Sequence, residues 1–217
     1  MIEAVQVSKD FGHPPTRVLS GIDLKIENGD FVSIHGRSGS GKSTLLYILS
    51  TLDHPTQGEV SFDGQKVKEM SVRDLDHLRN TQIGFIFQFH YLLPELTALE
   101  NILLPPRKTG QQEKFRGRAL ELISQFGLKG HEHKFPGQLS GGQQQRVAIT
   151  RALIMNPKYL FADEPTGNLD YQNGLMVLEI LKEVNATQGA TVVLVTHERD
   201  FSSMAKREVL LKDGFVV

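Results

Sequence analysis

Hydrophobic residues in the first part of the chain recur with the period of two that is typical of β-strands. Residues 5–7 and 22–26 alternate between apolar and polar side chains. Residues 31–35, 59–62 and 83–87 are short runs of strand length that are rich in apolar side chains, and a tight Asp-Gly turn follows the second of them. The pattern therefore predicts five strands before the middle of the chain.

Helical patterns separate these strands and then fill the middle of the chain. Residues 44–50 and 72–80 are predicted to be helices, and the Thr-Ala-Leu-Glu sequence at 97–100 is a capping box that marks the start of another. A further helix is predicted because apolar residues recur on one face at Phe115, Ala119, Leu122, Ile123 and Phe126. Residues 147–155 continue one more helix, so about residues 89–157 are predicted to form a helical insert.

The strand pattern resumes after this insert. Residues 159–162 and 191–195 are apolar strands with a predicted helix at 172–187 between them, and residues 208–217 are expected to form a closing hairpin. Strands that alternate with helices favour an α/β fold with a mainly parallel sheet. The alternating strands near the start favour an additional antiparallel β portion.

Length and composition are consistent with one domain. The chain has 217 residues, of which 39% are hydrophobic, and this is enough to bury a substantial core. We expect a single domain over 1–217, with a core made of residues 1–88 and 158–217 and the helical subdomain at about 89–157.

Charge and cysteine content exclude several classes of protein. The net charge is -1, so no overall basic field would attract nucleic acid, and the absence of cysteine excludes disulfides and thiolate metal sites. The first residues lack the basic and apolar regions of a secretory signal, and no apolar stretch approaches the roughly 18 residues of a membrane span. We therefore expect a soluble protein whose membrane role, if it has one, depends on a partner.

Residues 36–43 match the phosphate-loop pattern G-x-x-x-x-G-K-[ST] between a predicted strand and a predicted helix, which is the context that the motif requires. Glycines let the backbone wrap phosphates, Lys42 supplies positive charge at the β and γ phosphates, and the Ser43 hydroxyl is suited to Mg²⁺. A plain glycine turn is the alternative, but a chance match in a chain of this length is roughly one in a hundred. We expect nucleotide contacts from Gly36, Arg37, Ser38, Gly39, Ser40, Gly41, Lys42, Ser43 and Thr44.

A second candidate anion site lies about a hundred residues later. Residues 139–146 form a serine-and-glycine turn that opens a predicted helix, and the N–H groups and positive dipole of a helix start also suit an anion. One nucleotide needs one phosphate cradle, yet this chain has two such devices. The simplest arrangement that uses both is a homodimer in which two copies face each other with ATP between them.

Two acidic residues, Asp163 and Glu164, end a predicted core strand. Asp163 is placed to hold the shell of a magnesium ion, and Glu164 is placed to polarise an attacking water. The alternative is an ordinary acidic cap at a strand end, and the phosphate loop upstream favours the catalytic interpretation.

Other polar residues are less specific. Gln88 follows a predicted strand, where an amide could contact both metal and water, and His197 follows the last core strand, where an imidazole could reach a γ-phosphate. Each of them, taken alone, is more often a solvated side chain. His131 and His133 lie in a polar loop and are predicted to be solvated, since a His-x-His pair with no acidic or cysteine partner is weak evidence for a metal.

In their order along the chain, these motifs resemble the nucleotide-binding domain of ABC transporters, and the resemblance covers essentially the whole chain. It implies a RecA-like P-loop NTPase core with an inserted helical subdomain, ATP and Mg²⁺ as ligands, and hydrolysis by Lys42, Gln88, Glu164 and His197, the last as a switch histidine. It implies that Mg²⁺ is held by Ser43, Gln88 and Asp163.

The same resemblance assigns residues to adenine and to the opposite subunit. Phe11 would stack on adenine beside Val18; this phenylalanine stands where tyrosine is common, which keeps the aromatic face and loses the hydroxyl. Asp170 would lie in the loop that links the two sites. The γ-phosphate bound by the opposite subunit would be contacted by Leu139, Ser140, Gly141, Gly142 and Gln143.

Residues 52–58, 83–94, 97–101 and 164–170 resemble one group within this family, which contains ATPases of lipoprotein release, macrolide export and cell division. Residues 88–94 look most like the lipoprotein-releasing ATPases. This implies a peripheral homodimer at the cytoplasmic face of the bacterial inner membrane, driving separate integral-membrane permease subunits. Because the sequence stops at Val217, we expect the permease to be a separate protein rather than fused to this chain, provided that this is the full gene product. Residues 88–94 also contain four apolar side chains, Phe89, Tyr91, Leu92 and Leu93. These side chains either grip a permease helix or belong to the core of the insert.

Other classes of function are less consistent with the sequence. A P-loop GTPase would carry an Asn-Lys-x-Asp run, which is absent, and neither a GTPase nor a small-molecule kinase explains the serine-glycine turn. An ABC ATPase that acts on DNA or the ribosome would have long coiled coils or two tandem cassettes. A regulatory role in cell division, or in macrolide export, differs only in the partner and stays open at this point.

Overall fold

Two β-sheets form the framework of the computed structural model, which describes residues 1–217 apart from the side chain of Arg199. The strands are β1 (Ile2–Phe11), β2 (Thr16–Ile26), β3 (Phe31–His35), β4 (Gln57–Phe62), β5 (Gln65–Lys66), β6 (Ile83–Phe87), β7 (Tyr159–Asp163), β8 (Thr191–Val195), β9 (Arg207–Lys212) and β10 (Phe215–Val216). The α-helices are α1 (Lys42–Leu49), α2 (Val72–Thr81), α3 (Ala98–Ile102), α4 (Leu104–Lys108), α5 (Gln112–Gln125), α6 (Gly141–Leu153), α7 (Tyr171–Gln188) and α8 (Arg199–Ser202).

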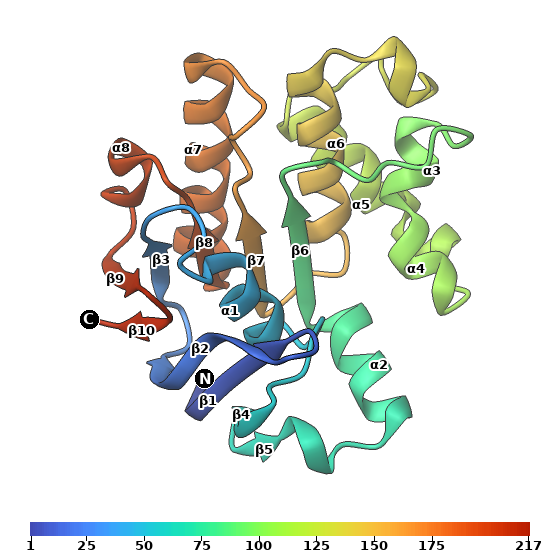
Figure 1. Cartoon of the computed structure of the whole chain (residues 1–217). Coiled ribbons are helices and arrows are strands. Elements are labelled where there is room, and N and C mark those ends of the chain that lie inside the picture. Colours follow the sequence, from blue (N-terminus) through green and yellow to red (C-terminus); the bar gives the residue numbers. More distant parts are fainter.

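The larger sheet has the order β10-β9-β3-β8-β7-β6, and only the β9–β10 pair in it is antiparallel. The smaller sheet is antiparallel, with the order β2-β1-β4-β5. Both features confirm the predicted α/β fold with an antiparallel amino-terminal portion. Figure 1 shows the helices α3 to α6 gathered beside β6 and the antiparallel strands below α1.

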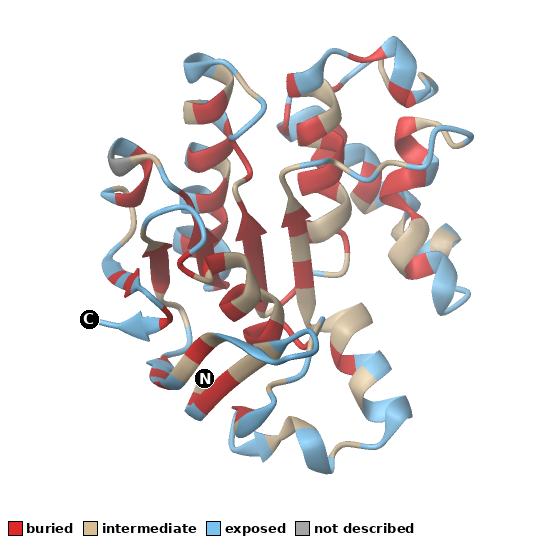
Figure 2. Ribbon diagram, viewed as in Figure 1, coloured by how far each residue is buried: buried red, intermediate tan, exposed pale blue. Residues whose placement is uncertain are grey.

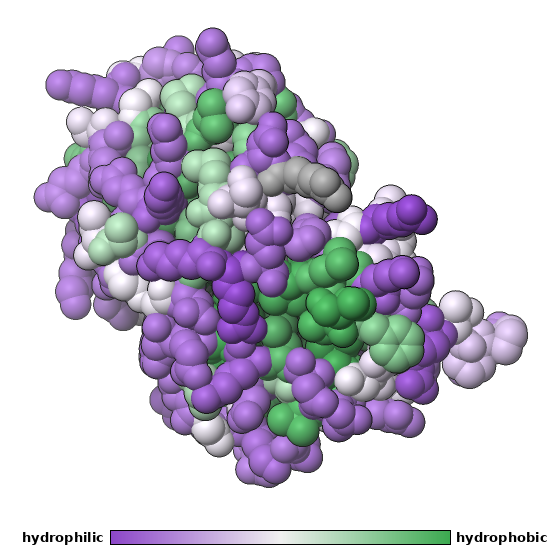
Figure 3. All heavy atoms as spheres, turned by 90° about the vertical axis from the view of Figure 1, so that its left-hand side faces the viewer, coloured by the Kyte–Doolittle hydropathy of each residue, from purple (hydrophilic) through white to green (hydrophobic). Residues whose placement is uncertain are grey.

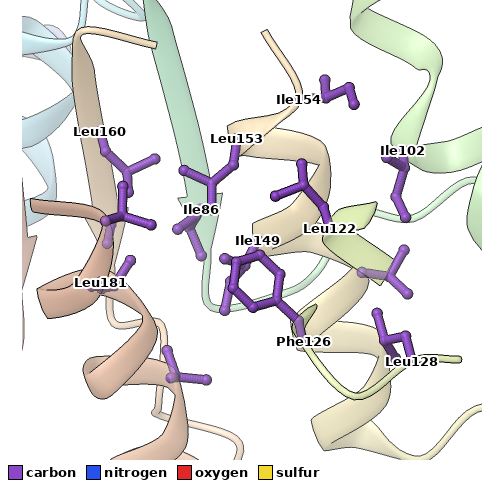
Figure 4. Close-up of a cluster of buried hydrophobic side chains, with 14 of the residues drawn as sticks. Ile86, Ile102, Leu122, Phe126, Leu128, Ile149, Leu153, Ile154, Leu160 and Leu181 are labelled. Atoms are coloured by element: carbon purple, nitrogen blue, oxygen red, sulfur yellow. The ribbon is translucent and has the colours of Figure 1, made fainter. Parts of the chain in front are cut away.

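The central strands are buried on both faces, as expected of a parallel sheet covered on both sides (Figure 2). One face of β7 and β8 packs against the helices through Leu160, Ala162, Val192 and Leu194, the cluster part of which Figure 4 shows. The other face packs toward α1 and the antiparallel sheet through Tyr159, Phe161, Val193 and Val195. The period of two in these strands therefore divides the molecule into two cores that share one sheet.

The predicted helices of the middle segment are confirmed, with one addition. Thr97 and Glu100 form the capping box at the start of α3, and Ala119, Leu122 and Ile123 are the buried face of α5. The short helix α4 was not predicted, because its sequence contains two prolines and only one turn of periodic pattern. None of the helices in the described part of the chain is both long and apolar enough to cross a membrane.

The hairpin of β9 and β10 forms the edge of the larger sheet. Figure 3 views the molecule from this side, and it shows apolar side chains gathered on the face. The exposed apolar residues of the hairpin are Leu210, Phe215, Val216 and Val217.

Phe161→Ala should lower the free energy of unfolding by about 3–5 kcal/mol, because Phe161 is fully buried between the parallel sheet and α1. Chemical denaturation monitored by circular dichroism measures this loss. Val72→Ala is a suitable control, since Val72 is 82% exposed and its truncation should change stability by less than about 0.5 kcal/mol. Equal effects of the two substitutions would contradict the described core.

Candidate nucleotide site

The polar residues predicted to act together follow the carboxyl ends of parallel strands. The loop at 36–43 follows β3, Gln88 follows β6, Asp163 ends β7 with Glu164 next to it, and His197 comes two residues after β8. Parallel strands bring their carboxyl ends to one edge of the sheet, which is where ligands bind in α/β folds. Figure 1 shows the loop between β3 and α1 at this edge.

Two glycines of the phosphate loop occupy places where no other residue fits. Gly36 has φ 157°, and a Cβ there would lie 2.1 Å from the carbonyl oxygen of Leu211. Gly41, the cap of α1, has φ 98°, and a Cβ there would lie 2.8 Å from the Leu19 side chain. The glycine pattern of the motif therefore has a steric cause in the packing of the loop on β2 and β9.

Lys42 lies inside the curve of this loop. Its ammonium donates hydrogen bonds to the carbonyl oxygens of Gly36 at 3.1 Å and Arg37 at 3.0 Å, and only 7% of the residue is exposed. The loop borders a hollow of about 280 Å³ lined by Val18, Ser38, Gly39, Gly41, Lys42, Ser43, Thr44 and Glu164. The structure thus brings most of the predicted nucleotide residues together with Glu164, and it places the Lys42 ammonium in the loop that borders the hollow.

Ser43 and Asp163 form an oxygen-rich pair beside this hollow. The Ser43 hydroxyl donates to Asp163 Oδ1 at 2.9 Å. Burial raises the pKa of Asp163, and hydrogen bonds from the Tyr47 and Ser43 hydroxyls oppose that rise. Hydroxyl and carboxylate oxygens are the ligands that Mg²⁺ prefers, so the pair fits a magnesium ion.

Tyr47 is a site residue that sequence reasoning missed. Burial, together with its hydrogen bond to Asp163, raises the pKa of the Tyr47 hydroxyl. Tyr47 lies four residues after Ser43 on α1, so the two side chains share one helix face. The spacing of four residues between Ser43 and Tyr47 was the sequence signal that could have identified Tyr47.

Asp163→Asn should raise the free energy of unfolding of the nucleotide-free protein at pH 7. Burial raises the folded-state pKa of Asp163 above its unfolded value, so the ionised form costs stability at any pH above that raised pKa. Asparagine removes the charge and keeps an oxygen that accepts from Ser43. Denaturant titrations as a function of pH measure the difference between the two proteins.

This difference should shrink as the pH falls through the raised pKa and should vanish below the unfolded pKa of about 3.9. A variant that is less stable than the parent at pH 7 would contradict the argument.

Glu164 has an unusual backbone conformation. Its φ is 45°, in the left-handed region that is uncommon for a side chain of this kind, and its N–H donates to the Val195 carbonyl at 2.9 Å. The carboxylate Oε1 lies 3.2 Å from His197 Nδ1. Strained backbone of this type clusters at active sites, and here it directs the carboxylate toward the imidazole and the hollow.

Gln88 is held by the loop that follows Glu164. Its carbonyl oxygen accepts from Asn168 Nδ2 at 3.1 Å, and its side chain packs so closely on Gly167 that a Cβ there would lie 2.8 Å from Gln88 Nε2. Further along, Arg151 of α6 donates to the carbonyl oxygens of His90 and Tyr91, each at 2.7 Å. Gln88 is thus connected to the loop after β7, and the residues that follow it are connected to α6. Gln88 is not among the residues that line the hollow.

Phe11 also lies outside the lining of the hollow, whereas Val18 is part of it. The ring of Phe11 is 46% exposed, and the Lys9 ammonium lies 4.9 Å from its centroid. A cation on one face of the ring leaves the other face for an aromatic ligand.

The serine-glycine turn caps α6. Ser140 Oγ accepts from the Gln143 N–H at 3.3 Å, and Gln143 Oε1 accepts from the Ser140 N–H at 2.9 Å. Ser140 and Gly141 are exposed, whereas the Leu139 side chain is buried in the helical core. A contact from Leu139 to a partner would therefore have to come from its backbone.

Within one chain this turn lies apart from the phosphate loop, since the amino-terminal end of α6 is at the top of Figure 1, across the ends of β6 and β7. Asp170 caps α7 by accepting from the Asn173 N–H at 3.0 Å, and this bond lowers the pKa of Asp170. Asn173, which sequence reasoning missed, also faces the turn, because a Cβ on Gly142 would lie 2.6 Å from its Oδ1. The linking loop and the turn are therefore neighbours in the same chain.

The prediction that His131 is solvated is wrong. His131 is partly buried, and its Nε2 lies 2.7 Å from Gln143 Nε2, so it faces the turn that caps α6. His133 is exposed, as predicted. A pattern of two histidines two residues apart gave no indication of this contact, because it depends on a helix that starts ten residues later.

Comparison with known proteins adds family information to this geometry. A model of the family described as ABC transporter matches residues 19–167. The protein named lipoprotein-releasing system ATP-binding protein LolD in Leptospira interrogans is 49% identical over 100% of this chain and 90% of its own length.

Solved structures that are similar to this chain are also ABC transporter cassettes. The structure described as dimeric MJ0796, a bacterial ABC transporter cassette, superposes with a TM-score of 0.91 at 44% identity, covering 100% of this chain and 96% of that one. A second dimeric structure of that cassette, in a post-hydrolysis state bound to ADP and Pi, has the same TM-score of 0.91 and the same coverage at 43% identity.

Proposed function

The chain belongs to the ABC transporter family of ATPases, and we propose that two copies of it close around two ATP molecules to drive a separate membrane permease. We propose further that the permease releases lipoproteins from the bacterial inner membrane, with this chain bound peripherally at the cytoplasmic face. The observation that supports lipoproteins as the substrate is the similarity to the lipoprotein-releasing protein of Leptospira interrogans, which extends over the whole chain and 90% of that relative.

ATP would bind with its phosphates in the loop before α1. Lys42 would neutralise the β and γ phosphates, while Phe11 and Val18 would border the adenine. A magnesium ion would be held by Ser43, Asp163 and Gln88 and would neutralise charge on the phosphate oxygens.

Hydrolysis would depend on the Glu164–His197 pair. The Glu164 carboxylate would polarise a water and accept its proton as the water oxygen attacks the γ-phosphorus and the bond to the ADP oxygen breaks. His197, with Nδ1 at 3.2 Å from Glu164 Oε1, would hold the carboxylate in position and present its other ring nitrogen to the γ-phosphate. The left-handed backbone at Glu164 supports this role.

The second copy would complete each site. Since the turn that caps α6 is remote from the phosphate loop of its own chain, it is free to meet the γ-phosphate held by the partner. The exposed Ser140 and Gly141 would provide this contact with Gly142 and Gln143 behind them, and Asp170, near the same turn, would link the two sites.

The permease would meet the loop that follows β6. Phe89 and Tyr91 are 62% and 63% exposed there, and Leu93 is also exposed, whereas Leu92 packs on the helical core. Arg151 ties this loop to α6, so closure of the dimer would move the helical subdomain at about 89–157 and the docked permease together.

The experiment uses tagged Glu164→Gln protein trapped with ATP in gently solubilised native membranes, followed by mass spectrometry of what co-purifies. A permease accompanied by acylated lipoproteins would support lipoprotein release. A cell-division partner or a drug-efflux permease would keep the ATPase mechanism and overturn the substrate. Recovery of no membrane protein would contradict the transport role.

A further inference from the structure

The amide of Gln143 has a fixed orientation in the turn that caps α6. Its Oε1 accepts from the Ser140 N–H at 2.9 Å, so the other end of the amide, the NH₂ group, is the end that faces His131 Nε2 at 2.7 Å. An amide nitrogen only donates. The imidazole Nε2 must therefore be the acceptor in this contact, which places the ring hydrogen on Nδ1.

No other assignment satisfies both contacts. A hydrogen on His131 Nε2 would place two donors 2.7 Å apart. Rotating the amide by half a turn would relieve that conflict, but it would then point the NH₂ group at the Ser140 N–H. The first change loses the contact between Gln143 and His131, and the second loses the bond from Ser140 N–H to Gln143, so the acceptor at His131 and the cap at Ser140 depend on each other.

The segment that carries His131 is itself anchored. The N–H groups of Ala98 and Leu99, at the start of α3, donate to the carbonyl oxygens of Lys134 and Glu132 at 2.8 and 3.0 Å. His131 Nδ1 is buried with no hydrogen-bond partner among the described residues, so the Gln143 contact is what holds the ring. A ring held in this way supports the turn from outside α6.

We propose that His131 is a positioning residue of the ATP site, in which a hydrogen-bond acceptor at this place holds Gln143 and thereby sets the Ser140 turn for the partner's γ-phosphate. This inference rests on the proposed ATP-bound dimer. It assigns no contact with nucleotide to His131 itself. It predicts that the ability to accept a hydrogen bond, rather than size or charge, is the property required at this position.

The test compares His131→Gln with His131→Lys and His131→Leu. The glutamine Oε1 extends about as far as the imidazole Nε2 and can accept a hydrogen bond, whereas the lysine and leucine side chains cannot accept one. All three are made in the Glu164→Gln chain, and ATP-dependent dimerisation is followed by sedimentation. The glutamine variant should keep the parent's half-maximal ATP concentration within about threefold. The lysine and leucine variants should raise it about tenfold or more, since the partly buried Gln143 NH₂ donor is left unpaired. ATP binding to the single chain, measured with a fluorescent nucleotide, should be the same in all of them.

A second measurement separates positioning from general stability. In a chain that also carries Gln143→Leu, exchanging His131 for lysine should have no further effect on dimerisation, because the group that the acceptor holds is gone. Equal dimerisation of the glutamine, lysine and leucine variants, or an undiminished lysine effect in the Gln143→Leu chain, would overturn the proposal. If the Glu164→Gln parent itself fails to dimerise with ATP, that result would contradict the proposed dimer and therefore also this inference.

Discussion

Glu164→Gln should lower steady-state ATP turnover at least about a hundred-fold while leaving ATP binding intact, because it removes the carboxylate that polarises the water. Glutamine keeps the size of the side chain and an oxygen that His197 can still approach, so the pocket should keep its shape. Phosphate release under saturating ATP measures turnover, and nucleotide titration measures binding.

Glu183→Gln is a matched control for this substitution. Glu183 is an exposed residue of α7 whose side chain bonds Gln125, away from the hollow, and its variant should turn over ATP like the parent. Turnover by the Glu164 variant close to that of the control would remove Glu164 from its assigned role.

Ser140→Arg should abolish ATP-driven dimerisation and leave single-chain ATP binding unchanged. The exposed Ser140 caps α6 at the place where the partner's γ-phosphate would lie, and a long side chain there would fill that space and remove the cap. The phosphate loop of the same chain is remote from this change. Sedimentation of the Glu164→Gln chain, with and without the added substitution, measures the effect.

Ser124→Arg provides the comparison, because Ser124 is an exposed position near the end of α5 and should tolerate arginine without loss of the dimer. A dimer that persists in the Ser140 variant at the same ATP concentration would show that the turn does not lie between the two copies.

The fold could be predicted from the sequence where the local pattern of apolar residues corresponds to the faces that are buried in the structure. The strands β7 and β8 are continuous apolar runs, and both proved to be buried on two faces. The short helix α4 escaped prediction because one turn of helix carries too little pattern.

The residues of the site also fall into two groups, those that the sequence predicts and those that it does not. The phosphate loop and Glu164 are visible because their spacing along the chain is itself the chemical requirement. Tyr47, Asn173 and His131 were missed because each acts on a group that belongs to another segment: Asp163 for the first, Gly142 for the second and Gln143 for the third. Contacts of this kind arise only when the strands and helices have been assembled.

The central claim is that two copies of this chain enclose two ATP molecules, and the most direct measurement is sedimentation equilibrium of the Glu164→Gln chain with quantification of the bound nucleotide. The account predicts a monomer without nucleotide, and with ATP a species of twice the chain mass that holds one ATP for each chain. A protein that binds ATP at saturation and still sediments at the mass of one chain would contradict it.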